Sequence, residues 1–176
     1  MASADSKQPT DAKESADLRL LRAMRTRWHP PGVESAAIAF GKAGNNGAVW
    51  VVIGLALALV DPGRRESWLI CAALAPIAIG LNYGVKLLVR RPRPVLKGLP
   101  PLGGAPSSLS FPSAHATSSF AVATAMCRVD PATSAAFLVA IALSLGRPYL
   151  GMHYPSDVLA GAVLGVIIGL IVPLSI

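Results

Sequence analysis

Hydrophobic residues fall into five runs along this chain, separated by short polar links and by one longer polar loop. The runs cover residues 47–60, 68–89, 113–127, 132–145 and 157–176. A helix needs about 20 residues to cross the hydrocarbon core of a bilayer, and only the second and fifth runs reach that length comfortably. None of the runs carries a polar face of the kind that covers a soluble protein. We therefore predict an all-α fold, a polytopic transmembrane helical bundle with about five spans.

The N-terminal part of the chain has a different pattern. Residues 1–17 are polar and unpatterned, which is typical of a disordered tail. Leucine and arginine recur at helical spacing in residues 18–28, which predicts a short interfacial helix that the His-Pro-Pro-Gly sequence at 29–32 ends. The moderately apolar residues 33–42 predict a second helix that lies against the bundle rather than crossing the membrane. We thus expect a tail followed by a single domain, residues 18–176.

The connections between the runs differ in length. Residues 61–67 and 128–131 are tight links, which predict antiparallel neighbouring helices. Residues 90–112 form a longer loop that is rich in proline, glycine and serine. Long loops in small domains are often functional, so we expect part of the functional site here.

Composition supports a membrane protein and excludes nucleic-acid binding. The chain is 53% hydrophobic and only 14% charged, against roughly 25% charged for a typical soluble domain. Mean hydropathy is +0.54, so there are too few polar residues to cover a soluble fold. The net charge is +7, but no aromatic interleaving or folded basic module accompanies it. Basic residues beside apolar runs are more simply anchors to anionic lipid headgroups.

Ionisable and capping residues gather in three clusters beside the apolar runs. The first contains Lys86 and Arg93, the second Ser113, Ala114 and His115, and the third Arg147, His153 and Asp157. Taken singly, each cluster has a structural explanation, such as a snorkelling lysine, an N-cap serine or a carboxylate at a helix N-terminus. Taken together they predict a phosphate site, because three fixed cations and two helix N-termini suit a doubly charged anion.

The two histidines add the groups that phosphate transfer needs. Asp157 follows His153 by four residues, close enough to accept a hydrogen bond from one imidazole nitrogen. The lone pair of the other nitrogen is then left to attack phosphorus. His115 supplies a second proton-transferring group. This combination predicts a phosphatase with a histidine nucleophile and a histidine acid.

The three clusters resemble the type 2 phosphatidic acid phosphatase superfamily, which also includes vanadium haloperoxidases. The family pattern K-x6-R-P runs here from Lys86 to Pro94, P-S-G-H appears as P-S-A-H ending at His115, and R-x5-H-x3-D ends at Asp157. Order and spacing match across about 72 residues. Ala114 stands where the family has glycine, and Gly146 stands where it has serine. Neither departure removes a group that makes or breaks bonds.

The resemblance implies a role for each residue. His153 attacks phosphorus to form a phosphohistidine and is oriented by Asp157, while His115 protonates the leaving alkoxide and then activates water. The phosphoryl oxygens would be held by Lys86, Arg93, Ser113, the Ala114 N–H and Arg147. No metal or other cofactor is implied, and the chain lacks an H-E-x-x-H motif or a carboxylate group able to hold Zn²⁺ or Mg²⁺. Cys71 and Cys127 lie inside apolar runs and look like small buried hydrophobes.

The sequence around the second and third motifs also resembles an actinobacterial subgroup, the decaprenylphosphoryl-5-phosphoribose phosphatases of cell-wall arabinan precursor synthesis. Undecaprenyl pyrophosphate, phosphatidylglycerophosphate and phosphatidic acid stay open as substrates, because each presents a phosphate on an apolar tail. Arg90 and Arg91 are expected to be free to meet the inner phosphodiester of a prenyl-linked phosphoribose. Two other classes are a non-catalytic lipid-phosphate carrier or flippase, and a serine hydrolase using Ser113. The presence of both histidines argues against a carrier or flippase, because binding an anion needs only cations. The absence of a G-x-S-x-G motif argues against a serine hydrolase.

Charge placement predicts which side of the plasma membrane the site faces. Apart from the proposed phosphate ligands, the loops on the two sides carry equal numbers of basic residues. These are Arg90, Arg91 and Lys97 on one side and Arg64, Arg65 and Arg128 on the other. Six further Lys and Arg residues lie in the first 27 positions. The positive-inside rule then places the active-site face in the cytoplasm, provided that residues 33–42 do not cross as a separate span.

Overall fold

The computed structural model describes residues 15–104 and 109–175, and this part of the chain contains helices and loops but no strand. The helices are α1 (Ala16–Thr26), α2 (Pro31–Ala43), α3 (Ala48–Val60), α4 (Arg65–Val89), α5 (Ala114–Val129), α6 (Ala136–Tyr149) and α7 (Pro155–Ile171). Short 3₁₀ helices η1 (Asn45–Gly47), η2 (Pro62–Arg64) and η3 (Pro131–Ala135) precede α3, α4 and α6. The all-α prediction is confirmed, and each of the five apolar runs contains one helix.

Helix lengths correct two details of the prediction. α7 ends at Ile171 after 17 residues, where Val172 is extended, so this helix is shorter than the predicted run of residues 157–176. Within the described residues, the helical segments 62–89 and 131–149 are long and apolar enough to cross a membrane. Helix α2 and the η1–α3 segment would add a third if this pair, bent by 53°, is counted as one span. Ala16 and Asp17, which we assigned to the tail, belong to the first turn of α1, while residues 1–14 lie outside the described part.

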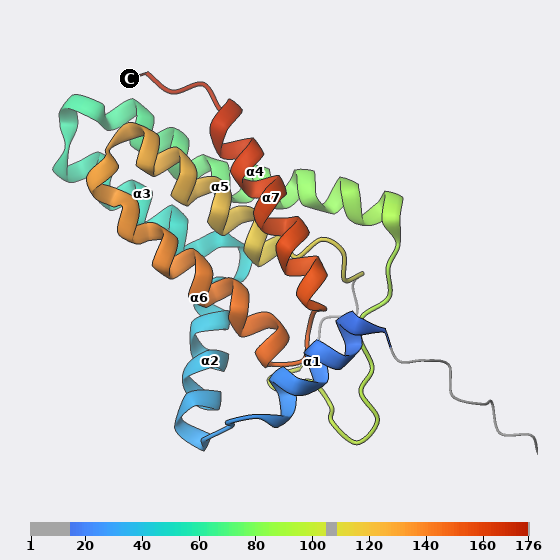
Figure 1. Cartoon of the computed structure of the whole chain (residues 1–176). Coiled ribbons are helices and arrows are strands. Elements are labelled where there is room, and N and C mark those ends of the chain that lie inside the picture. Colours follow the sequence, from blue (N-terminus) through green and yellow to red (C-terminus); the bar gives the residue numbers. More distant parts are fainter. Residues whose placement is uncertain (1–14, 105–108, 176) are drawn as a thin grey trace, which may run out of the picture.

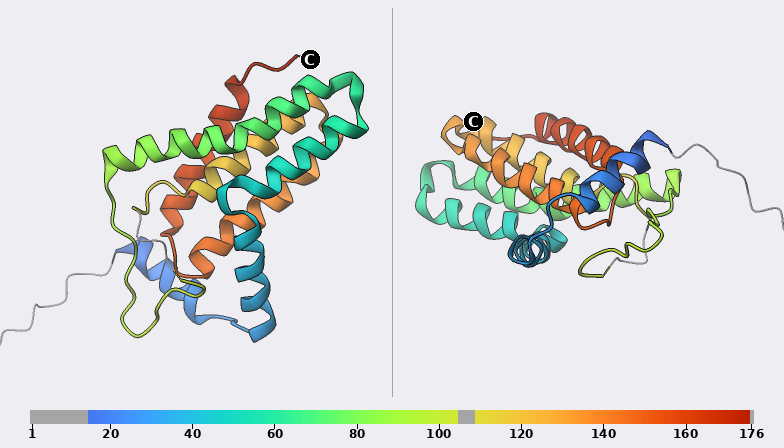
Figure 2. Two further views of the ribbon diagram at one scale, coloured as in Figure 1. Left: turned by 180° about the vertical axis from the view of Figure 1, so that it is seen from behind. Right: turned by 60° about the horizontal axis from the view of Figure 1, so that its bottom comes forward.

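Helix α5 is the centre of the bundle. It packs against α4, α6 and α7, and α3 packs on the outer side of α4. Eleven of the 16 residues of α5 are buried, many of them alanine, serine or threonine, which lets the neighbouring helices approach closely. Figures 1 and 2 show α3 to α7 running side by side, with α1 and α2 at one end of the bundle.

Glycines on α7 determine how closely it lies against α5. A Cβ added to Gly161, Gly165 or Gly169 would lie 2.6, 2.4 and 2.5 Å from backbone oxygens of α5 or the residue before it. Only glycine permits this approach, in which the two backbones are in direct contact. The Ser113 N–H donates to the carbonyl oxygen of Asp157 at 2.9 Å, so the first turns of both helices meet.

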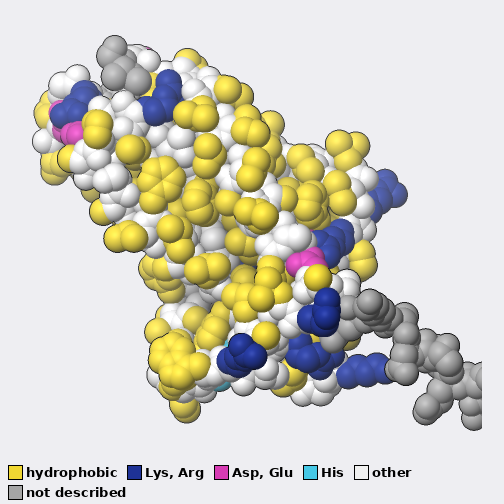
Figure 3. Space-filling model, viewed as in Figure 1, with side chains coloured by type: hydrophobic (Ala, Val, Ile, Leu, Met, Phe, Trp, Pro, Cys, Tyr) yellow, Lys and Arg dark blue, Asp and Glu magenta, His cyan; other side chains and the backbone are white. Residues whose placement is uncertain are grey.

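The outside of the bundle is apolar along its length. Side chains such as Leu59, Leu81, Leu138 and Leu159 are exposed on four different helices. In Figure 3 hydrophobic side chains cover the middle of the molecule, and Lys and Arg gather towards its two ends. Such a surface suits the bilayer and not water, so this is a membrane protein.

Candidate active site

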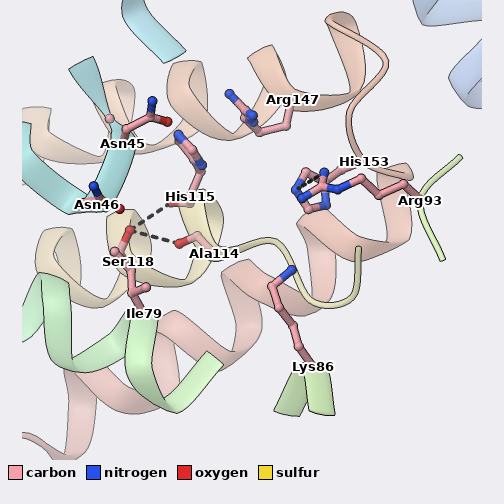
Figure 4. A pocket seen from close by; sticks show the side chains of 11 residues that line it. Asn45, Asn46, Ile79, Lys86, Arg93, Ala114, His115, Ser118, Arg147 and His153 are labelled. Carbon is pink, nitrogen blue, oxygen red and sulfur yellow. Dashed lines mark hydrogen bonds between the residues drawn. The ribbon is translucent and has the colours of Figure 1, made fainter. Parts of the chain in front are cut away.

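One cavity of about 220 Å³ lies where α4, α5 and the 90–112 loop meet the segment between α6 and α7. Six of the predicted site residues line it: Lys86, Arg93, Ala114, His115, Arg147 and His153. The fold therefore brings all three sequence clusters to one place. Figure 4 shows His153 and Arg93 on one side of this cavity and His115 on the other, with Arg147 and Lys86 between them.

His153 is buried and is held between a carboxylate and a cation. Its Nδ1 lies 3.4 Å from Oδ2 of Asp157, and its Nε2 lies 3.2 Å from Nη1 of Arg93. Because a guanidinium can only donate, Nε2 carries the lone pair, and the ring proton belongs on Nδ1, facing Asp157. Burial lowers the pKa of His153 to about 4, against the opposing effect of Asp157, with Arg93 and Lys86 adding to the fall. The ring is thus neutral, with its lone pair on the nitrogen nearest the cavity.

The carboxylate of Asp157 has no contact with solvent and is compensated by three partners. Its Oδ1 accepts from Nη1 of Arg91 at 2.8 Å, and its Oδ2 accepts from the Tyr154 N–H at 2.9 Å. Arg91 also pairs with Asp17 of α1 at 2.7 Å and lies 3.8 Å from the centre of the Tyr154 ring. The expectation that Arg91 is free to meet a substrate phosphate is therefore wrong, because its guanidinium is already paired with two carboxylates.

Asp17 ties the N-terminal helix to the same network. It accepts from the Ser156 N–H at 3.1 Å and from the Ser156 hydroxyl, beside its ion pair with Arg91. Burial alone raises the pKa of Asp17, but the hydrogen bonds from Ser156 and Arg91 outweigh it and hold the pKa below its usual value. No motif pointed to Asp17, since its partners are more than 70 positions away in sequence.

The three proposed phosphate cations are positioned by backbone carbonyls and by burial. Nζ of Lys86 donates to the carbonyl of Leu109 at 2.6 Å, and Nη1 of Arg93 donates to that of Met152 at 2.6 Å. Arg147 contacts the sulfur of Met152. Lys86 and Arg147 are each only 5% exposed. Within the described residues the hydrogen-bond partners of Lys86 and Arg147 are neutral, so these two buried cations retain most of their field and the cavity favours an anion.

Ser113 and Ala114 are placed differently from each other. Ser113 is the N-cap residue of α5, but it is fully buried, its Oγ has no partner in the described part of the chain, and it does not line the cavity. Ala114 does line the cavity as the first residue of α5, where backbone N–H groups have no partner within the helix. Of this pair, only Ala114 lines the cavity.

His115 lies against the C-terminal end of α2. Its Nε2 is 3.1 Å from the carbonyl oxygen of Gly41. A Cβ on Gly41 would lie 2.9 Å from Nη1 of Arg147, and one on Gly44 would lie 3.1 Å from Cδ2 of His115. Glycine at both positions lets the turn after α2 approach the two site residues. The α2–η1 segment is thus part of the site, although no pattern in the sequence indicated it.

Sequence reasoning also missed four other residues that line the cavity: Asn45, Asn46, Ile79 and Ser118. The Ser118 hydroxyl donates within α5 to the carbonyl of Ala114 at 3.0 Å. Asn45 and Asn46 form the 3₁₀ turn between α2 and α3, and Asn46 has a left-handed backbone with φ of 54°. Two adjacent asparagines before a glycine are a common turn signal, so nothing in their sequence distinguished them from an ordinary loop.

Comparison with known proteins agrees with this arrangement. The family model of the PAP2 superfamily matches residues 66–176. The chain is 38% identical over 152 residues to the decaprenylphosphoryl-5-phosphoribose phosphatase of Mycolicibacterium smegmatis, which covers 86% of this chain and 84% of that protein. The fold of this chain is similar to that of Aquifex aeolicus LpxE, with a TM-score of 0.74 and 25% identity. The match covers 90% of this chain and 95% of LpxE. The fold is also similar to that of the PAP2 type phosphatidylglycerolphosphate phosphatase of Bacillus subtilis, with a TM-score of 0.70, 24% identity and coverage of 92% and 84%.

Proposed function

Because this chain belongs to the PAP2 superfamily, we propose that it removes the terminal phosphate of decaprenylphosphoryl-5-phosphoribose in the synthesis of cell-wall arabinan precursors. The chain is a phosphatase, as its homologues are. Support for the substrate comes from the 38% identity that extends over most of both proteins. Support for the chemistry comes from one observation, a cavity in which a neutral histidine lies with three cations, of which Lys86 and Arg147 are buried.

In the first step Nε2 of His153 attacks phosphorus. The phosphate binds beside Lys86, Arg93 and Arg147. Its oxygens lose hydrogen bonds to water and accept charge-assisted hydrogen bonds from these cations instead. As the bond from nitrogen to phosphorus forms, the imidazolium that develops is stabilised by Asp157 through the proton on Nδ1. The product of this step is a phosphohistidine.

The leaving alkoxide receives its proton from His115. In-line displacement requires the leaving oxygen to lie opposite the attacking nitrogen, and His115 faces His153 across the cavity. His115, now neutral, then takes a proton from the water that attacks the phosphohistidine. Cleavage of the nitrogen–phosphorus bond returns the electron pair to Nε2 and releases inorganic phosphate.

We further place α3 to α7 across the membrane as five spans, with the cavity near the cytoplasmic surface. Exposed apolar side chains on α3, α4, α6 and α7 support the spans, with α5 buried between its neighbours. Contacts of α1 support the orientation, because Arg25 donates to the carbonyl of Pro100 at 2.9 Å and Asp17 bonds to Ser156. The basic N-terminal segment therefore lies at the cavity end, and α2 does not carry it to the other side. Positive charge is in excess at that end.

Other lipid phosphates are the alternatives within the same chemistry. The resemblance in fold to the Bacillus subtilis enzyme favours phosphatidylglycerophosphate as the second candidate. A carrier or flippase that only binds the phosphate needs the cations but has no use for a His153 oriented by Asp157.

The test is hydrolysis by the purified full chain in detergent, with phosphate release measured from the prenyl-linked phosphoribose, phosphatidylglycerophosphate, phosphatidic acid and undecaprenyl pyrophosphate. We expect the highest kcat/KM on the prenyl-linked phosphoribose. His153→Ala should reduce phosphate release from every substrate to background while the chain still folds. A preference for another lipid would reject the proposed substrate, and turnover by His153→Ala would reject the mechanism.

A further inference from the structure

We infer that the turn after α2 and the apolar groove between α2 and α6 form the binding site for the leaving group, with asparagine amides on the sugar and alanines along the prenyl chain. This inference rests on the proposed function, since it names the part of the site that recognises the organic half of that substrate. It concerns Asn45, Asn46 and the outer face of α2.

The direction of the leaving group follows from the two histidines. A leaving oxygen must lie on the far side of phosphorus from Nε2 of His153 and within reach of His115. His115 is the site residue that contacts the end of α2, through the carbonyl of Gly41 at 3.1 Å. Whatever is bonded to the leaving oxygen must therefore emerge beside the turn that follows α2.

That turn offers hydrogen-bonding groups suited to a sugar. Asn45 and Asn46 line the cavity, and in Figure 4 they lie beside His115, on the side away from Arg93. Both residues are exposed, and no hydrogen bond joins either side-chain amide to another residue of the described chain. Each amide can donate and accept, as ribose hydroxyls also do. Asn46 holds a left-handed backbone that few residues other than glycine adopt, a feature that gathers at ligand-binding turns.

The groove begins where this turn ends. It has a volume of about 680 Å³ and is lined by five alanines together with Val33 and Phe40. Its last α2 residue, Ala43, is followed directly by Gly44, which lines the catalytic cavity. The groove and the cavity are therefore lined by consecutive residues at the end of α2. Small side chains leave room for the methyl branches of a polyprenyl chain, and the outer side of the groove opens towards lipid.

A second hollow extends the same apolar path along α2, away from the turn and towards α1. It is lined by Trp28, Leu145 and Tyr149, among others, and shares Val33 and Ala37 with the groove. Together the two hollows follow the length of α2. A prenyl chain bound here lies along α2, while the sugar stays at the turn and the phosphate in the cavity.

Two variants test the sugar contacts. Asn45→Ala removes one amide, and Asn46→Gly removes the other while keeping a residue that tolerates a left-handed backbone. We compare kcat/KM on the prenyl-linked phosphoribose with kcat/KM on nitrophenyl phosphate, which has neither ribose nor tail. The loss on the ribose substrate should exceed the loss on nitrophenyl phosphate by about tenfold, as expected for one lost hydrogen bond to a bound ligand. Equal losses on both substrates would overturn the sugar subsite.

A third variant tests the groove. Ala39→Trp fills it, and Ala73→Trp is the matched control, because Ala73 is an exposed alanine on α4 outside the groove. Ala39→Trp should raise KM for the decaprenyl substrate relative to an analogue with two isoprene units, and Ala73→Trp should leave that ratio unchanged. The same ratio in both variants would overturn the groove as the prenyl site. If the wild type instead prefers phosphatidic acid, the proposed substrate fails, while these variants still test the leaving-group site with that lipid.

Discussion

A buried carboxylate is stable only when its charge is compensated, and at the scale of single residues this explains the role of Arg91. Asp157 is fully buried, and Arg91 is the cation in direct contact with it. The same guanidinium reaches Asp17 and the ring of Tyr154. Arg91 thus connects the residue that orients the nucleophile to the N-terminal helix. Arg93, two positions further along the chain, has a different place, since it lines the cavity and Arg91 does not.

Removing Arg91 should therefore slow catalysis on all substrates alike. In Arg91→Ala, Asp157 loses its cation and His153 loses part of the field that holds its tautomer, so kcat should fall about 10- to 100-fold. Arg90→Ala is the matched control. The Arg90 side chain is exposed, and among the described residues it donates only to the carbonyl of Leu87. Steady-state kinetics on the prenyl-linked phosphoribose and nitrophenyl phosphate measure both variants. A defect confined to the ribose substrate would show that Arg91 binds substrate after all.

The protonation of His153 gives a second prediction at this scale. His153 lies in the loop before α7, and burial lowers its pKa from 6.5 to about 4. Between these pH values His153 is protonated in the unfolded chain but neutral in the folded chain. The free energy of unfolding therefore decreases as pH falls from about 6.5 to about 4. The nucleophile also stays neutral until pH approaches 4. Imidazole NMR of labelled protein, with His153→Gln to assign the signal, should show a midpoint near 4, and a midpoint near 6.5 would contradict the burial of this ring.

At the scale of helices, local patterns predicted most of the fold but not the contacts between distant segments. Apolar runs indicated α3 to α7, because a stretch of apolar residues without a polar face extends over most of each helix. Motif spacing indicated Lys86, His115 and Arg147, since each lies at a fixed distance from another site residue on the same segment. Asn45 and Asp17 could not be found in this way. Their roles arise from the packing of α1 and α2 on the bundle, for which the sequence has no fixed spacing.

The close contact of α5 and α7 should depend on glycine. A Cβ on Gly165 would lie 2.4 Å from the carbonyl oxygen of Thr117, so Gly165→Ala forces the two helices apart. We expect a loss of about 2 kcal/mol in the free energy of unfolding, which for a chain of this size lowers Tm by roughly 4–8 °C. Gly80→Ala on α4 is the control, because a Cβ there meets nothing within 4 Å. Circular dichroism melts in detergent compare the two, and an equal Tm for both variants would contradict direct backbone contact of α5 and α7.

At the scale of the whole molecule, the charged ends decide how the bundle sits in the membrane. The cavity end carries the basic N-terminal segment, which contacts the 90–112 loop and the start of α7. The opposite end carries Arg64, Arg65 and Arg128 and has no comparable basic segment among the described residues. The excess of Lys and Arg residues at the cavity end is therefore larger than the numbers in the loops alone indicated. It favours a cytoplasmic cavity, to which a lipid-linked phosphate made inside the cell has direct access.

Cysteine labelling tests this orientation directly. In a chain with Cys71→Ala and Cys127→Ala, single cysteines are placed by Lys97→Cys in the cavity-side loop and by Gly63→Cys in the opposite link, both exposed positions. A membrane-impermeant maleimide should modify Gly63→Cys in intact cells and Lys97→Cys only in inverted vesicles, because the positive-inside rule places the more basic end in the cytoplasm. Each variant must retain phosphatase activity, which shows that the bundle is correctly inserted. Modification of Lys97→Cys in intact cells would reverse the orientation, and the cavity would then receive its substrate from the outer side of the membrane.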